Sequence, residues 1–441
     1  MLKKLLDLIP KGPSQKLGRD IGYTLGSFFV LAISGIIINV VITGVRDTDS
    51  LGVFNQAYAI YIVASQFAVM GIHYSVLRHA PVEAENIKER GALLGTATLL
   101  TLLLGITAAA IVYNSAPAIG GFFDSELVGS ATSYAAFGLI FFPLNKVFLF
   151  YLNGLRHMRV FSMLQALRYI IVMLCVIYVA FSDFGIDRAA LSFVAAEAAT
   201  SLIALGYILK AGLAQHMRVS AVWIKEHFRF GFRGLFAGMF AEFNSRVDVL
   251  VIGLFLEDRE VGIYSFAAML VDGLYHVLAM IRINFNPLLT MAHKQNDWST
   301  AISLQSKARR YLVPVMAALS GCVVLAYTGF DYFFVDGDWM REEGLPVLLI
   351  LLAGLIVVSP MIPFDNLMLV SGHPGYQTAQ QLCTVSANII FALLLLPVFG
   401  IAGAALGTVT SYFANVTALI LFSRRLVDWD ILRNRLKSKE A

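Results

Sequence analysis

The chain has 441 residues, of which 58% are hydrophobic and only 14% are charged, and its mean hydropathy is +0.74. Soluble domains are about a quarter charged, so this composition excludes an ordinary soluble protein and predicts an all-α polytopic membrane protein. The net charge of +4 follows from basic segments beside the membrane and requires no nucleic-acid partner.

Twelve apolar stretches are long enough to cross a hydrocarbon core about 30 Å thick. In chain order they are residues 20–44, 51–77, 91–113, 131–153, 161–182, 188–209, 233–256, 261–283, 311–330, 345–370, 378–397 and 401–423. The first 20 residues mix Lys and Leu, which predicts an interfacial amphipathic helix. The first span lacks a signal-cleavage site, so we expect it to be permanent.

Lys and Arg side chains are concentrated on one side of these spans. With the N-terminus inside, 25 of the 33 fall in inner segments and four in outer loops. Positive segments stay in the cytoplasm, so we expect both termini to be cytoplasmic. The three cysteines lie in apolar spans without the close spacing of a metal site or a disulfide framework, so no metal is expected.

The sequence repeats itself at an offset of about 210 residues. LGVFNQAYAI at 51–60 aligns with VGIYSFAAML at 261–270, and FGIDRAALSFVA at 184–195 aligns with FGIAGAALGTVT at 399–410. We therefore expect six-helix lobes in residues 1–215 and 216–423, followed by a cytoplasmic C-tail in 424–441. An even number of spans gives both lobes the same orientation, which predicts a pseudo-two-fold axis along the membrane normal and a site between the lobes.

Ionised side chains inside the expected spans are candidates for function, because each costs roughly 2.5–3.5 kcal/mol at the bilayer centre. The seventh span holds Glu242, Arg246 and Asp248. In a continuous helix Glu242 and Arg246 share a face, and Asp248 lies roughly 200° away from Arg246. We expect Arg246 to meet the substrate and Asp248 to hold the lobe together. An ion pair between Glu242 and Arg246 is the structural alternative.

Three further acid or imidazole groups are candidates for ion coupling or for structural pairing. Asp272 and His276 lie one turn apart in the eighth span. An Asp beside a His can exchange a proton, and the same spacing equally suits a structural hydrogen bond. Glu197 lies in the sixth span with no partner of opposite charge nearby in the sequence.

Four cations are candidates for substrate binding. Lys146 and Arg168 fall in the inner halves of the fourth and fifth spans, and Arg282 lies toward the inner end of the eighth. Together with Arg246 they would form a cationic cavity for a diphosphate or another anionic head group. For Lys146 and Arg168, snorkelling of the charge to the membrane interface is the alternative.

Motifs for catalysis or nucleotide binding are not visible. The sequence contains no HExxH, no GxSxG and no Walker A motif. We therefore expect neither an enzyme nor a cofactor. Energy for transport would come from a proton or sodium gradient, from the membrane potential, or from the concentration difference of the substrate.

One segment resembles a known family. Arg246-Val-Asp248, Gly253 and the following Glu260-Val-Gly262-Ile-Tyr264 are similar to a stretch of Wzx-type lipid-linked oligosaccharide flippases. These belong to the multidrug/oligosaccharidyl-lipid/polysaccharide exporter superfamily. The resemblance implies two six-helix lobes that alternate between inward-open and outward-open states around a cationic cavity containing Arg246. It implies that Asp248 neighbours Arg246 and that the two glycines and the tyrosine shape the turn into the eighth span.

The function implied is movement of a polyprenyl-diphosphate-linked oligosaccharide, such as an O-antigen or other surface-polysaccharide unit, across the bacterial inner membrane. The expected partners are this glycolipid and the bilayer, with polysaccharide polymerase machinery as a further candidate. A cation-coupled multidrug exporter is one alternative, although its cavity should be dominated by Asp and Glu. A glycan polymerase or ligase is another, but such enzymes carry a large outer loop with catalytic Arg or His, and the outer loops here are short.

Overall fold

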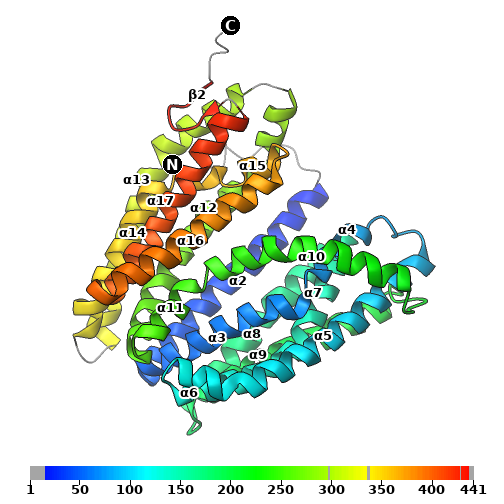
Figure 1. Cartoon of the computed structure of the whole chain (residues 1–441), viewed down its shortest axis with the longest axis horizontal. Helices are drawn as coiled ribbons and strands as arrows, with labels where there is room; N and C mark the ends of the chain where they lie inside the picture. Colours follow the sequence, from blue (N-terminus) through cyan, green and yellow to red (C-terminus); the bar gives the residue numbers. More distant parts are fainter. Residues whose placement is uncertain (1–14, 296–297, 335–337, 428, 437–441) are drawn as a thin grey trace. The chain divides into compact units, whose positions relative to one another are not determined.

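The computed structural model describes residues 15–295, 298–334, 338–427 and 429–436, so most of the expected amphipathic helix at the N-terminus lies outside the described residues. Nearly all of the described chain is α-helical (Figure 1), which confirms the expected fold class. The chain divides into two compact units. The first runs to Glu242 and also contains residues 257–262, and the second contains residues 243–256 and the chain from Ile263 onward.

The first unit is built from nine long or medium helices and one short 3-10 turn, within the described residues. They are α2 (Gln15–Val45), α3 (Thr48–Val69), α4 (Ile72–His79), α5 (Ile87–Phe122), α6 (Glu126–Ala136), α7 (Gly138–Gly154), α8 (Met158–Phe181), η1 (Ile186–Ala190), α9 (Leu191–Lys210) and α10 (Ala221–Asn244). Its core is formed mainly by apolar residues of α4, α5, α7 and α9.

The second unit begins with a short helix and ends in a small hairpin. Its elements are α11 (Val247–Phe255), α12 (Asp258–Gln295), α13 (Ser299–Phe334), η2 (Met340–Gly344), α14 (Leu345–Val358), η3 (Ile362–Phe364), α15 (Leu367–Val370), α16 (Pro374–Phe399), α17 (Ile401–Leu426), β1 (Trp429–Asp430) and β2 (Arg435–Leu436). The first five residues of α12 pack with the first unit.

Among the described residues, eight helices are long and apolar enough to cross a membrane, and up to eleven spans result if each bent helix pair counts as one. The bent pairs are α3 with α4, α6 with α7, and η2–α14 with η3–α15, at 56°, 48° and 58°. They correspond to the expected second, fourth and tenth spans. The first bend follows from Met70 and Gly71, which both adopt positive φ and so interrupt the helix.

The seventh span differs from the expectation. Residues 233–256 do not form one helix, because α10 ends at Asn244 and α11 begins only at Val247. Arg246 is the N-cap of α11, with φ −132° and ψ −9°. The angular argument that placed Arg246 and Asp248 on opposite faces of one helix was therefore wrong, since it required an uninterrupted 100° per residue.

The compact units also divide later than the sequence repeats. Helix α10 packs on the first unit up to Glu242, where the repeat boundary was expected near residue 215. His227 is fully buried and bonds both the Ser75 hydroxyl (2.9 Å) and the Leu93 carbonyl (3.2 Å). The Trp223 indole N–H donates to Glu89 at 3.0 Å. Side-chain contacts of this kind leave no trace in a hydropathy pattern. The division at residue 215 stays a prediction about the repeats.

The expected C-tail is partly folded. Trp429 and Asp430 pair antiparallel with Leu436 and Arg435, and the Trp429 side chain is buried against Trp298 of the second unit. The Arg309 guanidinium, on α13, donates to the Ile431 carbonyl at 3.0 Å. The hairpin thus belongs to the second unit.

Candidate functional site

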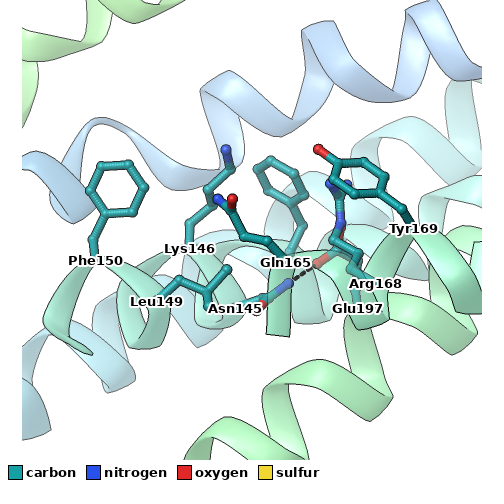
Figure 2. Close-up of a pocket in the computed structure, with 9 residues that line it drawn as sticks. Asn145, Lys146, Leu149, Phe150, Gln165, Arg168, Tyr169 and Glu197 are labelled. Carbon is teal, nitrogen blue, oxygen red and sulfur yellow. Dashed lines mark hydrogen bonds and ion pairs between the residues drawn. The ribbon is translucent and has the colours of Figure 1, made fainter. Parts of the chain in front are cut away.

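A polar pocket lies inside the first unit, between α7, α8 and α9. Its polar lining consists of Asn145, Lys146, Gln165, Arg168 and Glu197, and Phe142, Leu149, Phe150 and Tyr169 complete it (Figure 2). The empty volume is about 360 Å³, which includes the open mouth of the pocket. Even with the mouth included, this space lies at the lower end of the roughly 300–1,000 Å³ of ligand pockets, so it is too small for an oligosaccharide.

An ion pair forms one wall of the pocket. The Arg168 Nε donates to Glu197 Oε1 at 2.5 Å, and the Asn145 amide donates to the other carboxylate oxygen at 2.5 Å. The side chain of Glu197 is only 1% exposed and that of Arg168 is 14% exposed. Arg168 therefore faces an acid inside its own unit, and Glu197 has the partner that its sequence neighbours could not supply.

Lys146 is placed differently. Within the part of the chain that the structure describes, its ammonium forms no ion pair or hydrogen bond and lies over the Phe142 ring, 5.3 Å from the centroid. Figure 2 shows the ammonium directed away from the cluster of Asn145, Glu197 and Arg168. A compact, rotatable ammonium beside an aromatic face can bind a phosphate oxygen as a point charge.

The charge of Glu242 acts on residues that line or adjoin the pocket of the first unit. It is the last residue of the first unit before the helix break, and it interacts with the charge of Lys146 and with Tyr74 and Tyr169. The break after Asn244 separates it from the regular one-turn geometry with Arg246 that the sequence suggested.

In the second unit, Asp248 is held by a short chain of hydroxyl groups. The Tyr264 hydroxyl donates to Asp248 Oδ2 at 2.7 Å and lies 2.9 Å from the Thr408 hydroxyl. The Val249 backbone N–H donates to Asp248 Oδ1 at 2.9 Å. These bonds connect α11, α12 and α17, and the expected role of Asp248 in stabilising its lobe stays a prediction.

Arg246 and Asp272 lie in the same electrostatic neighbourhood as Asp248. The charge of Arg246 acts on both carboxylates, and Asp272 also interacts with Tyr412. Asp272 is exposed at its position on α12. The break before α11 removes the geometric reason for placing Arg246 and Asp248 on separate faces, and their separate roles stay a prediction.

The expected Asp272–His276 side-chain pair does not form. The His276 Nδ1 donates to the backbone carbonyl of Asp272 at 2.6 Å, so the imidazole is used within its own helix. Sequence spacing could not separate these outcomes, because the carbonyl and the carboxylate of residue i are both within reach of residue i+4.

Arg282 is paired inside the second unit. Its guanidinium lies 3.5 Å from Asp365 and 3.4 Å from the Tyr275 hydroxyl. Asn415 donates to Asp365 at 3.0 Å and accepts from Gln380 at 2.8 Å. The sequence reasoning missed Asn415 and Gln380, although amide side chains inside apolar spans were a usable signal.

The long apolar helices and the buried polar cluster in each unit define a multi-pass α-helical membrane protein. The family model of the polysaccharide biosynthesis proteins matches residues 17–293, and the chain belongs to this family. The match contains the segment from Arg246 to Tyr264 on which the resemblance was based, and it confirms the expected family.

Similar proteins agree with this assignment. The chain is 24% identical over 423 residues to a probable flippase, AglR, of Haloferax volcanii, with 90% of this chain and 81% of AglR covered. Its fold resembles an inward-facing multidrug resistance transporter of the MATE family, with a TM-score of 0.76, 14% identity, and 93% and 96% coverage. It also resembles the lipid II flippase MurJ, with a TM-score of 0.74, 13% identity, and 94% and 90% coverage. The chain therefore has the helical fold of these transporters.

Proposed function

We propose that the protein is a flippase that moves a polyprenyl-diphosphate-linked oligosaccharide from the inner to the outer leaflet by alternating access. The family, the probable flippase of H. volcanii and the fold of MurJ support this class of substrate. The observation that carries the proposal is Lys146, whose ammonium forms no ion pair or hydrogen bond among the described residues and lies on the wall of a polar pocket. The chain would act as a transporter without catalysis of its own.

In this proposal the four cations have different roles. Lys146 contacts the diphosphate, whereas Arg168 is held by Glu197 and shapes the pocket wall. Arg246 is the second cation we assign to the substrate. Arg282 is bound to Asp365 and supports the second unit. The sugar and the lipid tail must lie outside the pocket, because its volume cannot hold them.

We place the protein in the bacterial inner membrane with both termini in the cytoplasm, as the distribution of Lys and Arg indicates. Polysaccharide polymerase machinery, for instance that of O-antigen assembly, would receive the product. Transport would be driven by a proton or sodium gradient or by removal of the substrate. Asp272 is the candidate coupling group. It is an exposed carboxylate on α12, and the charge of Arg246 acts on it.

The test is movement of a fluorescent polyprenyl-diphosphate oligosaccharide in proteoliposomes. We expect Lys146→Gln to slow transport at least about tenfold, equivalent to roughly 1.4 kcal/mol of binding or barrier energy. The matched control is Lys210→Gln at the exposed end of α9, which should transport like the wild type. Full activity of Lys146→Gln would remove this lysine from the mechanism, and absence of transport by the wild type would end the flippase proposal.

A second candidate function is cation-coupled multidrug export, favoured by the similarity in fold to a multidrug resistance transporter of the MATE family. It predicts efflux of ethidium from the same proteoliposomes and no movement of the glycolipid. The two cargoes are therefore measured side by side, with an imposed pH or sodium gradient and with the Asp272→Asn variant.

A further inference from the structure

The first three turns of α10 have one face packed on the first unit. Trp223 is buried, and its indole N–H donates to Glu89 of α5. His227, four residues later, is fully buried and bonds α4 and α5. A Cβ atom placed on Gly231, four residues later again, would lie 2.6 Å from the carbonyl oxygen of Met70. Residues spaced by four lie on one side of a helix, so this line of α10 is fixed against the first unit.

The opposite face of the same turns is exposed. Val222 is 73% exposed and Phe232 is 54% exposed. Between them, Lys225 is exposed and the side chain of Arg229 is 62% exposed. At 100° per residue these four positions fall within about 80° of one another and nearly opposite the packed line. They form a stripe of two cations between two apolar side chains, referred to below as the basic stripe of α10.

The surface around the stripe carries a positive charge. Arg229 pairs with Glu226 at 2.9 Å. Lys225 forms no ion pair or hydrogen bond within the part of the chain that the structure describes. The exposed Arg78 of α4 lies beside α10, with its guanidinium 4.8 Å from the centroid of the Phe230 ring. Glu226 thus offsets one of these three cations, and the surface as a whole attracts anions.

The stripe directly precedes the expected seventh span at 233–256 and lies in the basic segment expected on the inner side of the membrane. A helix that exposes both cations and large apolar side chains beside a span suits the membrane interface. The apolar side chains reach toward the acyl chains, and the flexible stems of Lys and Arg bring their charges to the head groups. Anionic lipids of the inner leaflet attract basic segments in this position.

We propose that the basic stripe of α10 binds anionic phospholipids of the inner leaflet. Lys225 and Arg229 contact the lipid phosphate, while Val222 and Phe232 contact the upper acyl chains. The stripe shares no residue with the pocket that Lys146 lines. The inference concerns a lipid of the bilayer and not the transported glycolipid, so it goes beyond the proposed function. Because the other face of α10 is bonded to α4 and α5, the bound lipid would hold the first unit at the inner surface.

The test measures which lipid lies beside the stripe. Ala221→Cys, at the exposed start of α10, is labelled with the fluorophore NBD after replacement of Cys175, Cys322 and Cys383. The full chain is reconstituted in phosphatidylcholine vesicles that contain a nitroxide-labelled phosphatidylglycerol or the same fraction of nitroxide-labelled phosphatidylcholine. We expect stronger quenching by phosphatidylglycerol, because the stripe enriches the anionic lipid around the probe. Equal quenching by the two lipids would overturn the proposal.

Matched variants separate the stripe from the general positive charge of the inner side. One cation beside an anionic surface changes affinity about fivefold. We expect Lys225→Gln combined with Arg229→Gln to lower the association constant of phosphatidylglycerol relative to phosphatidylcholine at least about fivefold. Lys225→Arg combined with Arg229→Lys should retain the preference. Lys88→Gln combined with Lys210→Gln removes the same charge from exposed positions on the same side and should also retain it.

Two results with these variants would overturn the proposal. One is a preference for phosphatidylglycerol that survives loss of both stripe cations, and the other is an equal decrease in the control that lacks Lys88 and Lys210. NBD emission that follows the density of protein in the vesicles, and not the lipid composition, would indicate a second copy of the chain on the stripe and would also overturn it. None of these measurements uses the glycolipid, so failure of the flippase proposal leaves them unchanged.

Discussion

Replacing Arg168 with Met, Glu197 with Gln, and both together forms a double-mutant cycle on the ion pair buried in the first unit. At the 2.5 Å separation of the pair, the attraction is about 6 to 7 kcal/mol for an effective dielectric constant of about 20. Desolvation costs several kcal/mol for each ion, so the two contributions nearly cancel. A single substitution loses the attraction but leaves the other charge desolvated.

We expect each single substitution to lower the free energy of unfolding by about 3 to 5 kcal/mol, and the double substitution to cost less than either. In the double variant the side-chain amide that replaces the Glu197 carboxylate would still accept from the Asn145 amide, so the second hydrogen bond of this site is preserved. The free energy is measured by SDS titration in mixed micelles, with helicity as the signal. Losses that add to within about 0.5 kcal/mol would refute the reasoning, because independent sites behave in that way. Glycolipid transport by the folded double variant would assign Arg168 to structure and not to substrate contact.

Two further predictions concern His227 and Tyr264. Burial lowers the pKa of His227, which precedes the expected seventh span, from 6.5 to about 4. Its neutral form is favoured in the folded state, so stability is complete above pH 6.5 and falls by about 3 kcal/mol as the pH drops toward 4. Thermal melts of the wild type and of His227→Asn should therefore diverge in this pH window; parallel pH profiles would contradict the burial argument. Tyr264→Phe removes the hydroxyl bound to Asp248 and should cost about 1 to 3 kcal/mol, measured by SDS titration, whereas Tyr178→Phe, on the exposed face of α8, should be neutral. An equal effect of the two tyrosine substitutions would argue against the hydroxyl chain.

Local and periodic features could be predicted well from the sequence. Apolar length defined the membrane class and most spans, because a bilayer requires about 20 apolar residues per helix whatever the fold. The family segment at 246–264 and the repeat at 51–60 and 261–270 were also visible.

Partners of the buried charges could not be predicted, because helices separated in sequence supply them. Arg168 and Glu197 are 29 residues apart, and Arg282 and Asp365 are 83 apart. The pair proposed from spacing in the eighth span, Asp272 with His276, is replaced by a bond to the backbone. Spacing identifies neighbours on one helix, and tertiary packing selects the acid that each cation meets.

By itself, then, the sequence determined that this chain crosses the membrane, repeats itself and belongs with the polysaccharide exporters, because hydropathy, duplication and motif are properties of neighbouring residues. Only the tertiary structure decided that the seventh span is broken at Ser245–Arg246, that Arg168 is bound by Glu197 while Lys146 faces the pocket, and that α10 packs with the first unit. These outcomes depend on contacts between helices that are distant in the sequence. Burying a charge or a polar backbone group costs free energy, and the partner that offsets this cost is the one that packing brings within hydrogen-bonding distance.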